Sequence, residues 1–208
     1  MILRRPKRVM WLLNHSTLRK FEVEQLKLCG YEIFTPKSFP FNEGNLSASV
    51  TWTTDDTLSI PAEDLEILNN ADWYGSAGYE AWRIANEQFD IVICGFFPSQ
   101  ITDLRKHYSG KIVIRVFGLS GKTTYTDILR EELGEWEFIQ LQKLGDRLWF
   151  GAGYDHLAVN EGSFLRERNC FLPVGLKTDS DTEDWTGVRK HIYFVCPRIG
   201  TSPYFANI

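Results

Sequence analysis

Three short, continuous apolar runs, separated by segments of helical periodicity, constrain the fold of this chain most strongly. They are residues 9–13 (Val-Met-Trp-Leu-Leu), 90–94 (Asp-Ile-Val-Ile-Cys) and 111–116 (Lys-Ile-Val-Ile-Arg-Val). A run without polar alternation is typical of a strand buried on both faces, and such strands occur in parallel sheets covered by helices. The sequence therefore predicts a Rossmann-like three-layer αβα domain with a mostly parallel sheet.

The segments around these runs complete the predicted order of elements. The first run is followed by a helix over 21–28, which Gly30 would end as a C-cap glycine, and by a strand over 31–35. Further helices are expected from Pro61 onwards and over 78–88, 100–108 and 123–133. Residues 36–60 read as a long loop. After residue 135 we expect brief strands at 137–140, 148–150 and 171–172, a helical turn at 155–159, and a strand at 191–196.

Composition and charge exclude several classes of protein. The 208 residues carry 23 Lys and Arg against 27 Asp and Glu, a formal charge of −4, which gives no long-range attraction for nucleic acid. No apolar run approaches the roughly 20 residues that span a bilayer, and the N-terminus lacks the apolar core of a signal peptide. The four cysteines are far apart without a nearby His at ligand spacing, so we expect no metal site and reduced thiols in the cytoplasm.

The loops that follow the predicted strands are the expected binding region, because ligands bind beyond the carboxyl ends of parallel strands. These loops are 14–16, 95–99 and 117–122. Of the four histidines, only His15 falls in one of them, and there it could act as a general base toward a hydroxyl. The alternative is that His15 only hydrogen-bonds neighbouring polar groups of its own loop.

Aromatic residues are dense in the predicted loops, and Tyr74, Phe96 and Tyr154 are among them. The apolar faces of sugar rings stack on aromatic side chains. An aromatic rim therefore suits a carbohydrate or another flat amphipathic ligand, although the same residues could serve packing alone.

Residues 118–124 (Gly-Leu-Ser-Gly-Lys-Thr-Thr) lie between a predicted strand and a predicted helix, as a phosphate-binding loop does. The spacing from Gly118 to Gly121 is two residues too short for G-x-x-x-x-G-K-[ST], so we expect a tight turn instead. The amides at the start of the helix, with Lys122 beside them, could still bind an anionic group. The dinucleotide fingerprint G-x-G-x-x-G does not follow the first strand.

Several segments, taken in order, resemble the N-terminal half of GT-B glycosyltransferases. They are 8–15 (Arg-Val-Met-Trp-Leu-Leu-Asn-His), 28–36 (Leu-Cys-Gly-Tyr-Glu-Ile-Phe-Thr-Pro), 89–94 (Phe-Asp-Ile-Val-Ile-Cys) and 111–118 (Lys-Ile-Val-Ile-Arg-Val-Phe-Gly). Residues 172–176 (Leu-Pro-Val-Gly-Leu) are similar to the segment before the interdomain linker of that family. Residues 191–198 (His-Ile-Tyr-Phe-Val-Cys-Pro-Arg) resemble the opening of its nucleotide-sugar domain.

The resemblance implies an acceptor-side domain over residues 1–176, an acidic linker over 177–190, and the start of a second, missing α/β domain over 191–208. The full-length enzyme would then transfer a sugar from a nucleotide-sugar donor, held by the missing domain, to a glycan or lipid-linked acceptor, and this fragment alone would be inactive. No cofactor is implied, and peripheral membrane contact stays open. His15 matches the catalytic base of some inverting members. The substrate-binding residues are expected to be Asn14, Phe96, Gly118, Ser120, Lys122, Tyr154 and Arg198.

Two alternatives from other classes stay open at this point. The first is a non-catalytic α/β module whose rim binds a small ligand or a partner protein. The second is a nucleotide-utilising enzyme built around the degenerate loop at 118–124.

Overall fold

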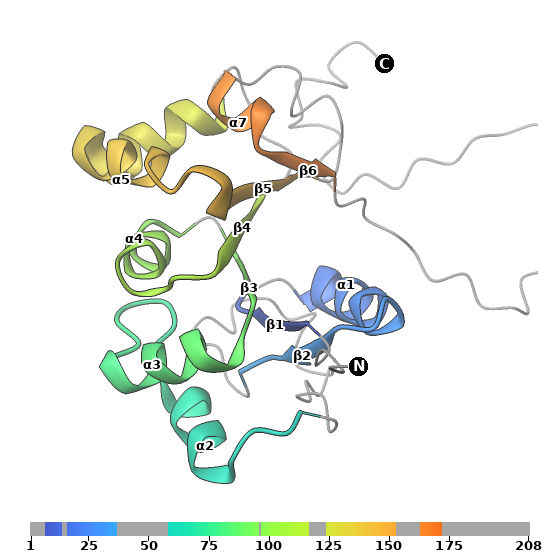
Figure 1. Cartoon of the computed structure of the whole chain (residues 1–208). Coiled ribbons are helices and arrows are strands. Elements are labelled where there is room, and N and C mark those ends of the chain that lie inside the picture. The colour runs from blue at the N-terminus through green and yellow to red at the C-terminus, as the bar shows by residue number, and fades with distance from the viewer. Residues whose placement is uncertain are drawn as a thin grey trace, which may run out of the picture.

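A single all-parallel sheet organises the part of the chain described by the computed structural model, which comprises residues 7–13, 16–36, 58–95, 97–116, 124–152 and 163–171 (Figure 1). Its six strands have the order β2-β1-β3-β4-β5-β6. They are β1 (Arg8–Trp11), β2 (Glu32–Phe34), β3 (Ile91–Cys94), β4 (Lys111–Val116), β5 (Leu148–Ala152) and β6 (Asn169–Phe171). The predicted Rossmann-like αβα fold with a parallel sheet is confirmed.

The helices cover the two faces of this sheet unequally (Figure 1). They are α1 (Ser16–Leu28), α2 (Ala62–Asn70), α3 (Tyr79–Gln88), α4 (Pro98–His107), α5 (Tyr125–Gln142) and α7 (Ser163–Glu167). Among these described helices, α1 alone lies on one face. Right-handed crossovers explain the asymmetry, because the chain steps from β1 to β2 in one direction and from β3 to β6 in the other.

The alternation of side chains along the strands separates two hydrophobic layers. In β1, Met10 contributes to the large layer under α2, α3, α4, α5 and α7, whereas Val9 and Trp11 face α1. In β3, Val92 and Ile93 divide in the same way. All of these side chains are nearly inaccessible to solvent, which is why the runs show no regular alternation of apolar and polar residues.

The predicted strand at 137–140 is wrong, because these residues continue α5. Gly134, with φ 77° and ψ 157°, interrupts the helix with a kink and does not end it. The helix resumes because Phe138 and Leu141, three positions apart, both reach the buried face while Trp136 points to solvent. The structure therefore has one kinked helix where the sequence predicted a short helix followed by a strand.

Replacing Gly134 by Ala should destabilise the protein by about 1–3 kcal/mol, because this backbone conformation is accessible to glycine and strained for every other residue. A Cβ at this position would meet no other atom within 4 Å, so the loss would report backbone strain and not a clash. Urea denaturation measures the difference. Glu131→Ala, an exposed substitution in the same helix, is the control and should be near neutral; an equal loss in both variants would contradict the explanation.

Most other element boundaries agree with expectation to within a few residues. α2 begins directly after Pro61, and Gly30 follows α1 with a φ of 82°. The helix expected at 123 begins at Tyr125. Most of the predicted loop at 36–60, the helical turn at 155–159, the linker at 177–190 and the strand at 191–196 lie outside the described residues, so the predicted domain boundaries stay predictions. None of the described helices has the length and apolar character needed to cross a membrane.

Candidate functional site

The order of the strands reverses between β1 and β3, and this reversal defines the candidate site. The chain moves from β1 outward to β2 and then returns to the other side of β1 as β3. In open parallel sheets, ligands bind at the carboxyl ends of the strands at such a switch point. We call the edge formed by Leu12, Leu13, Gly95 and Val116 the carboxyl rim.

Tyr74, from the connection between α2 and α3, lies beneath the carboxyl rim. Its hydroxyl donates a hydrogen bond of 2.9 Å to the carbonyl oxygen of Leu12, and its ring packs edge-on against Phe97 with the centroids 5.3 Å apart. Tyr74 is buried, so this hydrogen bond satisfies a polar group that water does not reach. The α2–α3 connection is thereby attached to the switch point itself.

Gln100, in the first turn of α4, holds the same connection from the other side. Its side chain is buried; Oε1 accepts a hydrogen bond of 3.2 Å from the Gly95 amide, and Nε2 donates one of 2.9 Å to the Trp73 carbonyl oxygen. The neighbouring Ser99 hydroxyl donates to the Tyr74 carbonyl oxygen. These three bonds tie the end of β3, the start of α4 and the α2–α3 connection into one rigid unit.

Gly95 has little free space around its Cα atom. A Cβ at this position would lie 2.9 Å from the Phe97 ring and 3.2 Å from Leu13. Only glycine therefore fits without displacing these neighbours. The side chains of Phe97 and Leu13 therefore pack directly against Gly95 at the rim between β1 and β3.

On the α1 face, β4 carries a buried charge near the carboxyl rim. Arg115 is fully buried; its Nε and Nη2 donate to Glu22 Oε1 of α1, the former over 2.9 Å, and its Nη1 donates to the Gly151 carbonyl oxygen over 2.6 Å. Burial raises the pKa of Glu22, and the hydrogen bond and charge of Arg115 oppose that rise. The ion pair joins α1 to the centre of the sheet.

Two observations concern possible metal and thiol chemistry. Within the described ranges, no three His, Cys, Asp or Glu residues gather as a metal site requires. The three described cysteines are free; Cys29 is exposed, whereas burial raises the pKa of the Cys94 and Cys170 thiols. A raised pKa reduces the thiolate fraction that nucleophilic chemistry needs, so neither Cys94 nor Cys170 is suited to it.

The predicted site residues all lie outside the described residues: His15, Asn14, Phe96, Gly118, Ser120, Lys122, Tyr154 and Arg198. Their side-chain arrangement stays a prediction. Described residues next to several of them in sequence do belong to the carboxyl rim, because Leu13 and Gly95 follow β1 and β3 and Val116 ends β4. The loops expected to carry the site therefore leave the sheet at one edge.

Sequence reasoning counted Tyr74 among the aromatic loop residues but did not identify its hydrogen bond to Leu12. It also did not identify Gln100 or the Arg115–Glu22 pair as parts of this region. The partners of these side chains lie far away along the chain, with 93 positions between Glu22 and Arg115 and 62 between Leu12 and Tyr74. The one available signal was a charged residue within the apolar run 111–116, since a buried charge requires a partner.

The fold defines the class of protein as a Rossmann-like three-layer α/β domain. Comparison with known protein families, with curated proteins and with solved structures finds no match to this chain.

Proposed function

We propose that this chain is the acceptor-side domain of a glycosyltransferase of the GT-B type. One observation carries the proposal: the sheet order brings the ends of β1, β3 and β4 to a single edge, so the loops that contain His15, Phe96 and Lys122 leave the sheet side by side. A general base, an aromatic surface and a cation in adjacent loops would suit a sugar acceptor next to an anionic donor. The sequence resemblance supports the same assignment.

In this proposal, the acceptor hydroxyl binds at the carboxyl rim next to Leu13 and Gly95. His15 would take the proton of that hydroxyl as its oxygen forms the new bond to the anomeric carbon. The bond from that carbon to the nucleotide diphosphate breaks, and the diphosphate leaves with the bonding electrons. The nucleotide sugar would be held by a second domain, as the resemblance implies.

The geometry at the start of α5 gives less support to a nucleotide-binding loop at 118–124. A phosphate-binding loop passes from G-K-[ST] directly into its helix. Here Thr124 has an extended backbone, with φ −81° and ψ 158°, and separates that sequence from the first helical residue. Its hydroxyl accepts a hydrogen bond of 3.1 Å from the Asp127 amide, so it serves as the N-cap of α5.

NMR titration of the chain with simple sugars tests the proposal. The probes are methyl glycosides of glucose, galactose, mannose and N-acetylglucosamine. We expect at least one of them to shift the amide signals of Leu13, Gly95 and Val116 and the imidazole signal of His15, because these residues border the proposed acceptor site. Signals at the opposite edge of the sheet, such as those of Lys111 and Glu32, should stay in place.

His107 is the matched control, since it is a half-exposed histidine at the C-terminal end of α4, away from the rim. The His15→Ala and His107→Ala variants assign the two imidazole signals. If none of the sugars shifts the rim signals, the proposal fails and a non-catalytic module for another ligand gains support. Shifts confined to His107 would place sugar binding elsewhere on the molecule.

A further inference from the structure

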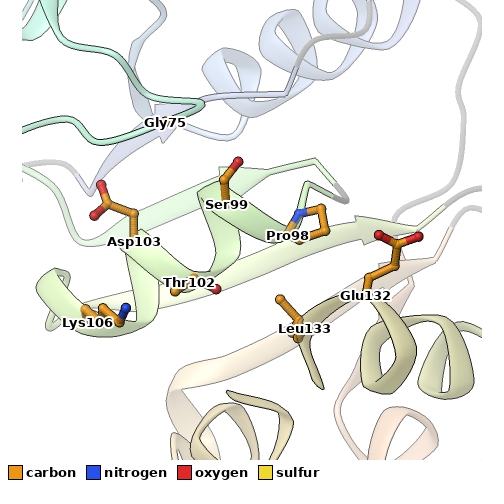
Figure 2. A pocket seen from close by; sticks show the side chains of 8 residues that line it. All are labelled: Gly75, Pro98, Ser99, Thr102, Asp103, Lys106, Glu132 and Leu133. Carbon is orange, nitrogen blue, oxygen red and sulfur yellow. The ribbon is translucent and has the colours of Figure 1, made fainter. Parts of the chain in front are cut away.

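A groove of about 350 Å³ lies on the helical layer away from the sheet (Figure 2). α4 forms its floor, the α2–α3 connection forms one wall at Gly75, and α5 forms the other wall at Glu132 and Leu133. The α4 residues that line it are Pro98, Ser99, Thr102, Asp103 and Lys106. Its volume is at the lower end of the range found for small-ligand sites, about 300–1,000 Å³.

The walls of the groove are fixed by contacts with α4. Asp103 Oδ2 accepts hydrogen bonds of 3.1 Å from the Ala77 amide and 2.8 Å from Trp82 Nε1, and these hold the α2–α3 connection in place. On the α5 side, Arg105 and Glu137 form an ion pair of 2.7 Å just beyond the kink. Glu132 and Leu133 directly precede the kink at Gly134, so the groove is open where α5 changes direction.

Three polar groups in the groove have no partner within the described part of the chain. They are the Thr102 hydroxyl, the Lys106 ammonium and the Glu132 carboxylate, whereas Ser99 and Asp103 are engaged in the bonds given above. Figure 2 shows Lys106 and Glu132 at opposite ends of the groove, with Thr102 and Leu133 between them. The groove therefore presents a cation at one end, an anion at the other, and a hydroxyl and an apolar side chain in the middle.

We propose that this groove binds a short zwitterionic peptide of about dipeptide size. The peptide carboxylate would pair with Lys106, its ammonium with Glu132, and its central amide would hydrogen-bond Thr102, while small side chains would contact Pro98 and Leu133. An elongated ligand with opposite charges at its two ends complements the cation and the anion at the two ends of the groove. This inference concerns a second site and does not depend on the proposed function at the carboxyl rim.

Titration of the full chain with L-alanyl-L-alanine, followed by amide NMR, tests the inference. The Thr102 and Leu133 signals should shift with about millimolar affinity, because exposed ion pairs contribute little each. Alanyl-alanine amide lacks the carboxylate and N-acetyl-alanyl-alanine lacks the ammonium, so each should bind at least several-fold more weakly. Absence of any shift with alanyl-alanine would overturn the inference.

Variants of the two charged residues identify which end of the peptide each one contacts. Lys106→Met should weaken alanyl-alanine several-fold but leave the binding of alanyl-alanine amide unchanged, because that analogue already lacks the group that Lys106 would contact. Glu132→Gln should show the same pattern with the N-acetyl analogue. Glu131→Gln, at an exposed position beside the groove, is the matched control and should have no effect.

Cellobiose, an uncharged disaccharide, separates peptide binding from sugar binding at the same place. If cellobiose shifts the Thr102 and Leu133 signals and alanyl-alanine does not, the groove is a saccharide site and the inference is wrong. Equal binding of alanyl-alanine to the wild type, Lys106→Met and Glu132→Gln would also overturn it. Circular dichroism of each variant confirms that these surface substitutions leave the fold intact.

Discussion

Replacing Arg115 by Met is expected to lower the free energy of unfolding by about 3–5 kcal/mol at neutral pH, the range for removing one partner of a buried ion pair. The loss follows from what remains in the variant. Glu22 would stay largely buried between α1 and the sheet but would lose the guanidinium that donates two hydrogen bonds to it. The Gly151 carbonyl oxygen would also lose its donor. Urea denaturation of the wild type and the variant measures the difference.

The pH dependence of the Arg115→Met variant provides a second test. Burial already raises the pKa of Glu22, and removing Arg115 removes the contribution that lowers it. A carboxyl group whose folded-state pKa exceeds its unfolded value binds protons on folding, so stability is lost as pH rises through that interval. The destabilisation should therefore be smaller at about pH 5 than at about pH 7.5; a loss independent of pH would contradict this explanation.

Two further variants distinguish the unpaired charge from lost packing. Combining Arg115→Met with Glu22→Gln removes both charges, so the double variant should be more stable than Arg115→Met alone. Arg83→Met is the surface control, because Arg83 forms its ion pairs with Glu80 and Glu87 in an exposed position. Its effect should be far smaller than that of Arg115→Met.

Replacing Gln100 by Leu should cost about 2–4 kcal/mol, because it leaves two buried backbone groups without a partner at about 1–3 kcal/mol each. These groups are the Gly95 amide and the Trp73 carbonyl oxygen, which the Gln100 side chain now satisfies. Leu has nearly the volume of Gln, so the lost stability would come more from the missing hydrogen bonds than from altered packing. Urea denaturation measures the loss in the free energy of unfolding. Faster hydrogen exchange of the Gly95 amide would show that this loss arises at the carboxyl rim.

Gln142→Leu serves as the control for the Gln100 variant. Gln142 is exposed at the end of α5, so its replacement should change stability by no more than about 0.5 kcal/mol. If Gln100→Leu were equally neutral, the described hydrogen bonds would not stabilise the rim, and the view of the α2–α3 connection as a rigid unit would fail.

The sequence was sufficient for most of the fold because the signals involved are local. Strands buried on both faces have continuous apolar sequences, and their alternation with helices indicates a parallel sheet. The error at 137–140 has a physical cause: Gly134 resembles a helix terminator, but the buried residues Phe138 and Leu141 stabilise a further helical segment after it. The three-residue spacing of this pair is the signal that favoured a helix.

The region around the site was less predictable because it depends on contacts between distant segments. The loops at the carboxyl rim could be named from the ends of the strands alone. The Tyr74 and Gln100 hydrogen bonds could not, since nothing in the residues near 74 indicates which carbonyl oxygen lies above the Tyr74 hydroxyl. The roles assigned to His15 and the other predicted side chains stay predictions, because those residues lie outside the described part of the chain.

The unequal helical coverage of the two sheet faces also affects local unfolding. One hydrophobic layer includes residues from five described helices, whereas the layer under α1 is small and contains the Arg115–Glu22 pair. Proteins open in cooperative units, and the unit with the least buried apolar surface opens at the lowest free energy. Among the described residues, we therefore expect α1 to detach from the sheet at a lower free energy than the helices of the larger layer do as a unit. Because α1 begins shortly after the rim residues that follow β1, a ligand bound at the rim would favour the state in which α1 is attached to the sheet.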